Sequence, residues 1–299
     1  MNKLTLYLIV LIGLTVFCLP TVGSAQKYPL EMSSTQTEES GFLDQEGKIS
    51  IQSKHASLTL PLLLFDSFKF IVYLNEDEKL FSYTDFESSF HLEDSTKDYK
   101  MENLPEKLIT STRGLIFIFG IADANWLFRR DQILATDSVE LKDNDIRYMN
   151  QFFYTPISND SSTWSYGFSY FTGMTSDVFI PLLGYKYKGD SLYINSVLPS
   201  YFIAQFRLSD HFYFLIDETF ESETFRLTDE DPWNAAAFSF LKLISRAELG
   251  FEIAGFQAGI SYGMISPTLW KVFDTDQNEL GTMDLESTTQ WSLQIQWVI

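Results

Sequence analysis

Cysteine is nearly absent from this chain. The one cysteine, Cys18, lies in an apolar run near the N-terminus, between Leu4 and Leu19. We expect this run to be removed with a signal peptide. The mature protein would then hold no cysteine, which excludes disulfide bonds, cysteine–metal sites and cysteine nucleophiles. Phe17 precedes Cys18, whereas a cysteine that receives a lipid normally follows a small residue, so we do not expect a lipoprotein.

Histidine is also scarce, and catalytic motifs are missing. His55, His91 and His211 are far apart and form no pair with metal-ligand spacing. The sequence contains neither a G-x-S-x-G nucleophile motif nor a glycine-rich phosphate loop. Ser209 and Asp210 precede His211, but "LSDHF" is more typical of a hairpin turn than of a catalytic group. We therefore predict no enzyme, no metal and no cofactor.

Positive charge is low. The chain has 21 Lys and Arg against 40 Asp and Glu, a formal net charge of -19, and no basic block, so we expect no nucleic-acid binding. Phe, Tyr and Trp make up 16% of the residues, which is too apolar for a disordered acidic chain. The aromatic surface must therefore be buried against protein or lipid.

Long segments with a helical period are lacking too. From Lys48 to the end, runs of about 8 to 12 residues alternate in polarity or are uniformly apolar, and polar turns separate them. In "STWSYGFSYFTG" and in the terminal "TTQWSLQIQWVI", every second residue is large and apolar. The runs "RAELGFEIAG" and "FQAGISYG" meet at Ala254–Gly255, which predicts a tight hairpin.

Strand length indicates the surroundings. Strands of soluble sandwiches most often have about 5 or 6 residues, whereas a membrane-spanning strand needs about 9 to 11. Lipid also requires every backbone polar group to be paired internally, which a closed barrel achieves. We predict an all-β chain that forms a closed antiparallel transmembrane β-barrel of roughly 12 strands, with the last strand pairing with the first.

Three regions follow from this interpretation. Residues 1–25 are expected to be a cleaved signal peptide, because a charged start, a short apolar run and small residues before position 26 are its usual features. Residues 26–47 are polar and aperiodic and are expected to be a flexible segment. Residues 48–299 are expected to form the barrel, in the cell outer membrane.

The alternation of side chains along each strand divides the barrel residues between an inner and an outer face. The polar side chains that we expect to face the lumen are Arg246, Glu248, Glu252, Gln257, Gln290, Gln294 and Gln296. The aromatic side chains that we expect at the lipid–water interfaces are Trp164, Tyr185, Tyr187, Trp291 and Trp297. We expect outer-membrane lipid and lipopolysaccharide around the barrel, and we expect the barrel assembly machinery to recognise Gln290–Ile299.

Two short acidic runs, Glu76–Glu78 and Asp229–Asp231, allow two interpretations. They could bind divalent cations, or they could be solvated loop charge; their spacing matches no calcium-binding loop of the EF type.

The order of the strand motifs resembles an uncharacterised family of Gram-negative outer-membrane β-barrels, known as a domain of unknown function. The resembling segments are "LTLPLLLFDSFKFIVYL", "QILATDSVELKDNDIRY", "FIPLLGYKYKGDSLYINSVLPSYFIAQFRLSDHFYFLIDETFESETFRL" and "RAELGFEIAGFQAGISYG". Pro181, Gly184, Tyr185, Tyr187 and Pro199 carry the likeness best. The resemblance implies a barrel and a membrane location, and it supplies no activity.

The sequence alone does not decide between several classes of function. Passive passage of small solutes, binding of small apolar molecules and a structural role at the cell surface all fit a barrel with acidic loops. The solute is unknown. "LTLPLLLF" and "GLIFIFGIA" are apolar on both faces, which also fits buried strands, so a soluble exported β-sheet binding protein is the alternative.

Overall fold

The computed structural model describes residues 29–43, 47–65, 67–84, 89–91, 98–100, 105–137, 146–157, 161–172, 177–227, 235–274, 276 and 278–298. The expected signal peptide lies outside them. The strands are β1 (Pro29–Thr37), β2 (Ser40–Gly41), β3 (Lys48–Phe65), β4 (Phe68–Thr84), β5 (Ser89–His91), β6 (Asp98–Lys100), β7 (Lys107–Ile121), β8 (Ala124–Thr136), β9 (Ile146–Pro156), β10 (Ser162–Phe171), β11 (Val178–Lys188), β12 (Leu192–Leu198), β13 (Tyr201–Arg207), β14 (Phe212–Arg226), β15 (Ala235–Ile253), β16 (Phe256–Ile265), β17 (Thr268–Asp274), β18 (Glu279–Leu285) and β19 (Thr288–Val298). In these residues, no helix is long and apolar enough to cross a membrane.

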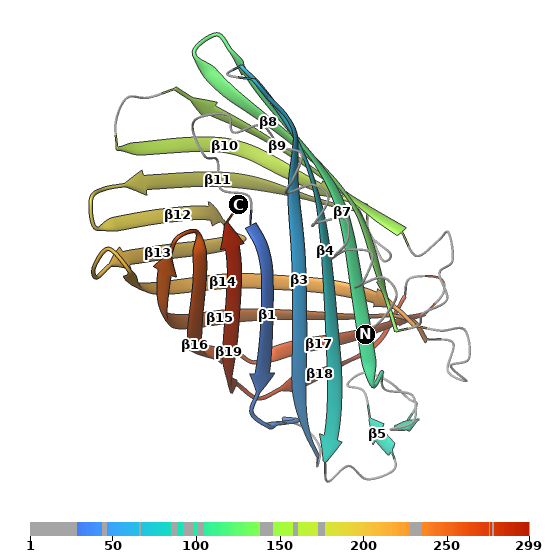
Figure 1. Cartoon of the computed structure of the whole chain (residues 1–299). Helices are drawn as coiled ribbons and strands as arrows, with labels where there is room; N and C mark the ends of the chain where they lie inside the picture. Colours follow the sequence, from blue (N-terminus) through green and yellow to red (C-terminus); the bar gives the residue numbers. More distant parts are fainter. Residues whose placement is uncertain are drawn as a thin grey trace.

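The strands form one closed antiparallel barrel, as the alternation predicted. Its fourteen strands follow the order β1, β3, β4, β7 to β16 and β19, and β19 pairs with β1 to close the cylinder. The strands tilt strongly, so that β3 and β4 cross β10, β11, β14 and β15 in projection (Figure 1). At the predicted hairpin, Ala254 and Gly255 have φ angles of 49° and 83°, as a tight turn of primed type requires.

The first barrel strand corrects one expected boundary. We expected residues 26–47 to be a flexible lead-in, but Pro29–Thr37 forms β1, which pairs with β19 on one side and β3 on the other. Hydrogen bonding along both edges outweighs the polar composition of this segment. Only Leu30 and Met32 supply large apolar side chains on the face that pairs with Trp297 and Ile295, and this weak pattern explains why the strand was missed.

The outer face of the cylinder is apolar and rich in aromatic rings. Phe117 stacks on Phe70 with ring centroids 4.6 Å apart, and rows of such contacts continue across β8 to β11. On the terminal strand, Trp291, Leu293 and Trp297 each keep close to half of their surface exposed. Because such a surface is unfavourable in water, it fits a barrel wall in contact with hydrocarbon.

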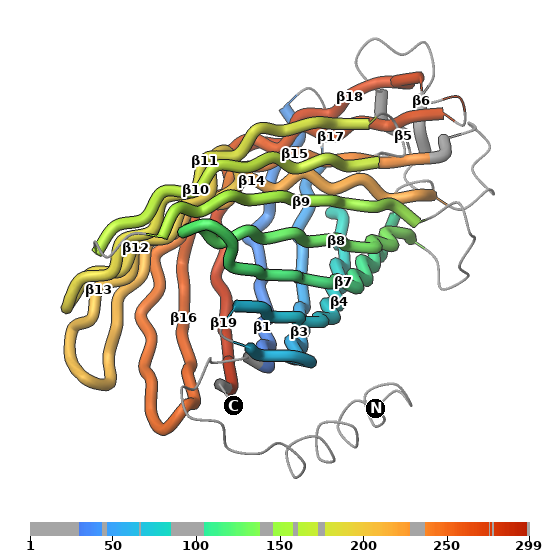
Figure 2. The backbone as a smooth tube through the Cα atoms, turned by 90° about the horizontal axis from the view of Figure 1, so that it is seen from above, coloured from blue at the N-terminus to red at the C-terminus, as the bar shows by residue number. Residues whose placement is uncertain are grey.

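One end of the barrel is extended into a narrower closed ring. The hairpin β17–β18 pairs with β15, and Phe42, which follows β2, bridges to Leu285 of β18. A parallel bridge between Thr136 of β8 and Arg226 of β14 completes this ring. We call this part the headpiece: β2, β17, β18 and the adjoining ends of β3, β4, β7, β8, β14 and β15. Figure 2 shows β17 and β18 far from the C-terminus.

The headpiece has a dense apolar core. The indole of Trp270 makes a T-shaped contact with Phe238 at 4.7 Å and with Phe81 at 5.9 Å. Trp270, Phe238 and Phe225 are all at most 1% exposed. Within the part of the headpiece that the structure describes, such a packed core leaves no water-filled passage along the axis.

The opposite end, which we call the turn end, carries the short hairpin turns that follow β3, β7, β11, β13 and β15.

In part of the wall between the two ends, neighbouring strands are not hydrogen-bonded to each other. On its β11 side, β12 pairs with Leu183–Lys188, and on its β14 side, β13 pairs with Tyr213–Thr219. Among the described residues, Val178–Leu182 of β11 and Glu221–Phe225 of β14 therefore have no strand partner on the sides that face each other, and Phe220 is bonded there only to the Ser200 carbonyl of the β12–β13 turn. We call this place the wall gap.

Candidate functional site

The inner wall of the barrel is polar, and it is the candidate site. All seven side chains expected in the lumen lie on the face of their strands opposite the exposed apolar chains. Glu248 is 7% exposed and Gln290 is 4% exposed, whereas the outward-facing Leu249 and Trp291 are about half exposed. The alternation along β15, β16 and β19 produces this division directly.

Two contacts fix the charged residues of β15. Arg246 donates from Nε to Oδ1 of Asp217 at 3.0 Å, and the Arg246 Nη2 atom lies 3.0 Å from the same oxygen. Tyr213 donates its hydroxyl to Oε1 of Glu248 at 2.8 Å. Both partners come from β14, so the two strands are joined inside the lumen as well as through their backbones.

The remaining predicted lumen residues form shorter links around the wall. Gln257 donates to Oε2 of Glu252 at 2.8 Å, and Gln294 donates to Oε1 of Glu31 at 2.8 Å. Gln296 lies opposite Gln257 in the ladder between β16 and β19. The amides therefore hold the lumen carboxylates near the closing seam of the barrel.

Sequence reasoning missed a second polar cluster, on β4 and β8. The Tyr73 hydroxyl donates to Oδ1 of the fully buried Asp131, and Arg129 Nε lies 2.6 Å from the Tyr73 oxygen. The Arg129 Nη2 atom also lies 2.7 Å from Oδ2 of Asp131. The charged residues at 129 and 131, which alternate on one face of the strand, were the available signal, but Tyr73 is 58 residues away from Asp131 in sequence.

A charged layer separates the lumen from the headpiece core. Lys79 pairs with Glu223, and Lys242 Nζ lies 3.0 Å from Oε2 of Glu221. Both ammonium groups also approach the Phe240 ring of the core, at 5.0 Å and 5.4 Å. Buried charges of this kind are stable only when paired, and these pairs lie directly below the apolar packing.

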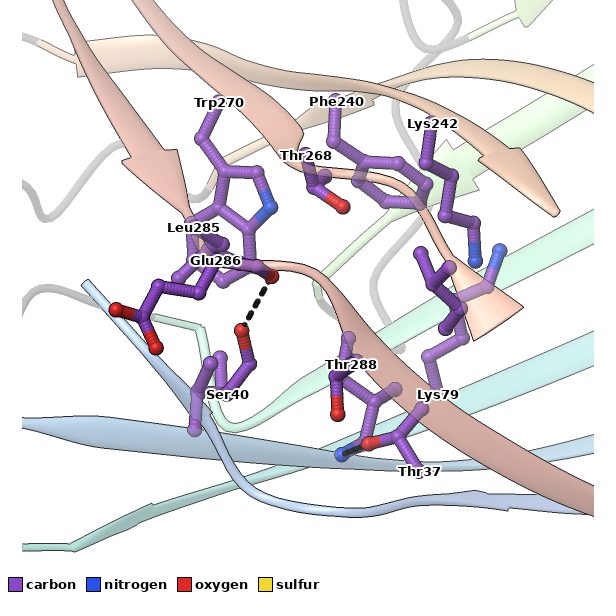
Figure 3. Close-up of a pocket in the computed structure, with 13 residues that line it drawn as sticks. Thr37, Ser40, Lys79, Phe240, Lys242, Thr268, Trp270, Leu285, Glu286 and Thr288 are labelled. Carbon is purple, nitrogen blue, oxygen red and sulfur yellow. Dashed lines mark hydrogen bonds between the residues drawn. The ribbon is translucent and has the colours of Figure 1, made fainter. Parts of the chain in front are cut away.

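A small cavity of about 20 Å³ lies at this junction. Figure 3 shows Trp270 and Phe240 on one side of it and Lys79 and Lys242 converging on another. The Ser40 hydroxyl donates to the Glu286 carbonyl at 2.7 Å across the same space. The volume has room for one or two waters, so the junction is a closed seam and not a ligand pocket.

The turn end holds a larger cavity of about 510 Å³. It is bounded by the β11–β12 hairpin, by β13 and, on another side, by Glu252 and Gln257. The lumen is thus accessible at the turn end and closed by the charged layer and the apolar core at the headpiece.

The predicted interface aromatics all lie on the outer face. Trp164 and Tyr185 contact each other with centroids 4.7 Å apart, and Tyr187 follows on the same face of β11. Trp291 and Trp297 are 49% and 56% exposed. Their position at the lipid–water interfaces stays a prediction.

The exterior of the headpiece is polar, unlike the exterior of the wall. Ion pairs join Lys107 to Glu78 at 3.1 Å and Lys271 to Glu279 at 2.7 Å. Gln52 and Lys54 are exposed on β3. The change from apolar to polar along the same strands indicates that the headpiece projects beyond the hydrocarbon layer.

The described residues contain no group of three or more His, Cys, Asp or Glu side chains arranged to hold a metal ion. In the first acidic run, Asp77 turns inward to the His55 ring at 2.7 Å, while Glu78 turns outward. The run Asp229–Asp231 lies outside the described residues. The His211 ring Nδ1 lies 3.3 Å from the backbone carbonyl oxygen of Glu252, and the Ser209 hydroxyl accepts from the backbone N–H groups of His211 and Phe212, as in a hairpin turn.

No family model and no curated protein matches the chain. Solved structures that are similar to it include an outer membrane channel from Pseudomonas putida F1, at 8% identity and a TM-score of 0.47, covering 94% of this chain and 97% of the channel. They also include the TodX monoaromatic hydrocarbon channel, at 9% identity and a TM-score of 0.41, covering 93% and 91%. The translocator domain of the autotransporter NalP from Neisseria meningitidis is similar at 10% identity and a TM-score of 0.32, covering 99% and 97%. Function has to be argued from the barrel itself.

Proposed function

We propose that this protein is an outer-membrane barrel that admits small solutes to its lumen from the turn end and restricts their passage at the headpiece. One observation carries the proposal: a charged layer and an apolar core lie in succession across one end of an otherwise polar lumen. A constantly open pore would need water along its whole axis, and the packing of the described residues around Trp270 leaves no room for it there.

The same proposal assigns an orientation. The short turns face the periplasm and the polar headpiece faces outward, because outer-membrane barrels have short periplasmic turns and longer external loops. Lipid contacts the aromatic wall, and lipopolysaccharide surrounds its outer rim. The terminal segment Gln290–Ile299, whose outward face is aromatic and aliphatic, is the part that we propose the assembly machinery recognises.

Conductance in planar bilayers tests the closed axis. Ile265 of β16 pairs with Thr288 of β19, so residues 266–287 can be replaced by an Asn-Gly turn without moving either strand. We expect the unaltered protein to give no steady conductance steps and the shortened protein to give them. Lys271→Gln, which changes only an exposed pair, should behave like the unaltered protein. Large steady steps from the unaltered protein would contradict the proposal.

The wall gap favours a second candidate function, exchange of apolar solutes with the bilayer. Phe179 and Leu198, on the outer face beside the gap, are 62% and 53% exposed, while Leu182 faces inward next to it. A spin label at Leu182→Cys should be more accessible to oxygen, which dissolves in lipid, than to a water-soluble nickel complex. A label at Gln257→Cys in the turn-end cavity should show the reverse. Equal accessibility profiles at the two positions would remove this candidate.

A further inference from the structure

The turn-end cavity contains two basic side chains for which the described part of the chain supplies no ion-pair partner. Lys188 ends β11 and Arg207 ends β13, and both line the cavity. Among the described residues, neither takes part in a salt bridge, although the deeper cations Arg246, Arg129 and Lys242 are all paired.

These two cations stand out against the composition of the chain. A protein of formal net charge -19 has acidic groups in excess, and deeper in the lumen it pairs Arg246 with Asp217 and Lys242 with Glu221. At the cavity, Glu252 is bonded instead by Gln257 at 2.8 Å, and Asp190 lies in the hairpin turn. The arrangement leaves Lys188 and Arg207 available to a negatively charged guest.

Deeper in the lumen, the same part of the wall carries aliphatic side chains among polar ones, since Ile203 lies between Asn195 and Asp217 in its two ladders. Ile203 lies on the same face of β13 as Arg207, four residues away, which is about 13 Å along a strand. Leu215 lies opposite Gln205 on the neighbouring strand, and Val197 faces inward on β12. A molecule held by its charge at the mouth would therefore place an apolar body against aliphatic side chains.

We propose that this cavity binds small carboxylates with an apolar body, the carboxylate at Lys188 and Arg207 and the body toward Ile203 and Leu215. A volume of about 510 Å³ is within the range of sites for small organic ligands. This rests on the proposed function, because it names the class of solute that the turn end admits. Glu252 and Asp190 disfavour multiply charged anions, so the preferred guest carries a single negative charge.

Binding of 4-fluorobenzoate, followed by fluorine NMR on the full-length mature protein in nanodiscs, tests the site. We expect Lys188→Gln and Arg207→Gln each to weaken binding about three- to tenfold, and Asp190→Asn to strengthen it. Lys54→Gln, an exposed outer-face control, should change nothing. 4-Fluorobenzyl alcohol and 4-fluorobenzylamine should bind more weakly than the acid, and acetate should compete poorly because it lacks the apolar body.

Several results would overturn the site. These are equal affinity for the acid and the alcohol, unchanged binding in both basic-residue variants, or acetate competing as well as 4-fluorobenzoate. If either variant does not fold, rising sodium chloride on the unaltered protein gives the same information, because ion pairing to a partly exposed base is screened by salt. Conductance is a separate readout: an open axis with normal carboxylate binding rejects the restricted passage, and a closed axis without carboxylate binding rejects the site.

Discussion

The ring of Tyr213 lies flat over Gly250 of the neighbouring strand, so that a Cβ at Gly250 would be 2.1 Å from Cζ of the ring. Tyr73 lies over Gly114 in the same way, with its ring atoms 2.0 Å from the position of a Cβ. Each missing side chain lets a tyrosine fold against the lumen wall and reach a carboxylate, Glu248 in one case and Asp131 in the other.

Substituting Gly250 therefore tests how the inner wall is packed. Gly250→Ala should displace Tyr213 from Glu248 and lower the free energy of unfolding by about 1 to 3 kcal/mol, the usual cost of overpacking. Urea unfolding in detergent, followed by the gel mobility of unboiled samples, measures the change. Gly120→Ala is the matched control, because its nearest neighbouring atom would be 3.7 Å away. Equal losses in the two variants would show that the contact with Tyr213 does not matter.

Neighbouring positions on β19 test whether the outer face meets lipid. Leu293→Arg places a charge on the exposed apolar face and should destabilise the folded barrel in bilayers by about 2 to 4 kcal/mol, if the position is near the midplane. Gln294→Arg points the other way, where it can pair with Glu31, and should be tolerated. Folding yield into liposomes measures both. If Leu293→Arg is as well folded as Gln294→Arg and stays soluble without detergent, the soluble alternative gains and the membrane proposal fails.

In the charged layer, removing one partner of an ion pair should destabilise the protein more than removing both partners. Lys242→Met leaves Glu221 without the ammonium that lies 3.0 Å away, so we expect the free energy of unfolding to fall by about 3 kcal/mol. The double variant Lys242→Met, Glu221→Leu removes the unpaired charge and should recover most of that loss. Unfolding midpoints of Lys242→Met, of Glu221→Leu and of the double variant give the coupling energy between the two side chains. Additive losses would mean that the pair is not coupled.

The first strand should be needed for closure. A chain that lacks residues 29–37 exposes the backbone edges of both β3 and β19, and each unpaired group at lipid depth costs several kcal/mol. We expect no heat-modifiable band for this truncation. The Asn-Gly replacement of residues 266–287, which leaves both edges paired, should still give one. A stable barrel without β1 would require a different closing strand.

The closed barrel could be predicted because its signal is local. Alternation along "TTQWSLQIQWVI" places Trp291 and Gln290 on opposite faces, whatever the rest of the chain does. The strand number was close but low, at roughly 12 against fourteen. Part of the reason is that β1 carries mostly Glu, Ser and Thr, and its place in the barrel depends on partners in β3 and β19.

The headpiece and the polar pairs could not be predicted, because they join distant segments. Lys79 and Glu223 are 144 residues apart, and nothing near either residue indicates the other. Trp270 is in a run that alternates like any strand, and it is enclosed by Phe42, Phe81 and Phe238 from other strands. No family model matches the chain, so the family resemblance inferred from strand motifs is not confirmed. The loose spacing of aromatic and turn residues identified the barrel architecture and no more.

The headpiece shares β3, β4, β7, β8, β14 and β15 with the wall, and these strands run from one to the other without a break. It therefore has no hinge and cannot swing aside like a separate lid. Any widening of the narrow ring has to break the bridge between Thr136 of β8 and Arg226 of β14 and reshape the cylinder below it. A load applied to the tip of the headpiece, such as an attached macromolecule, is carried mechanically along the same six strands down to the turn end.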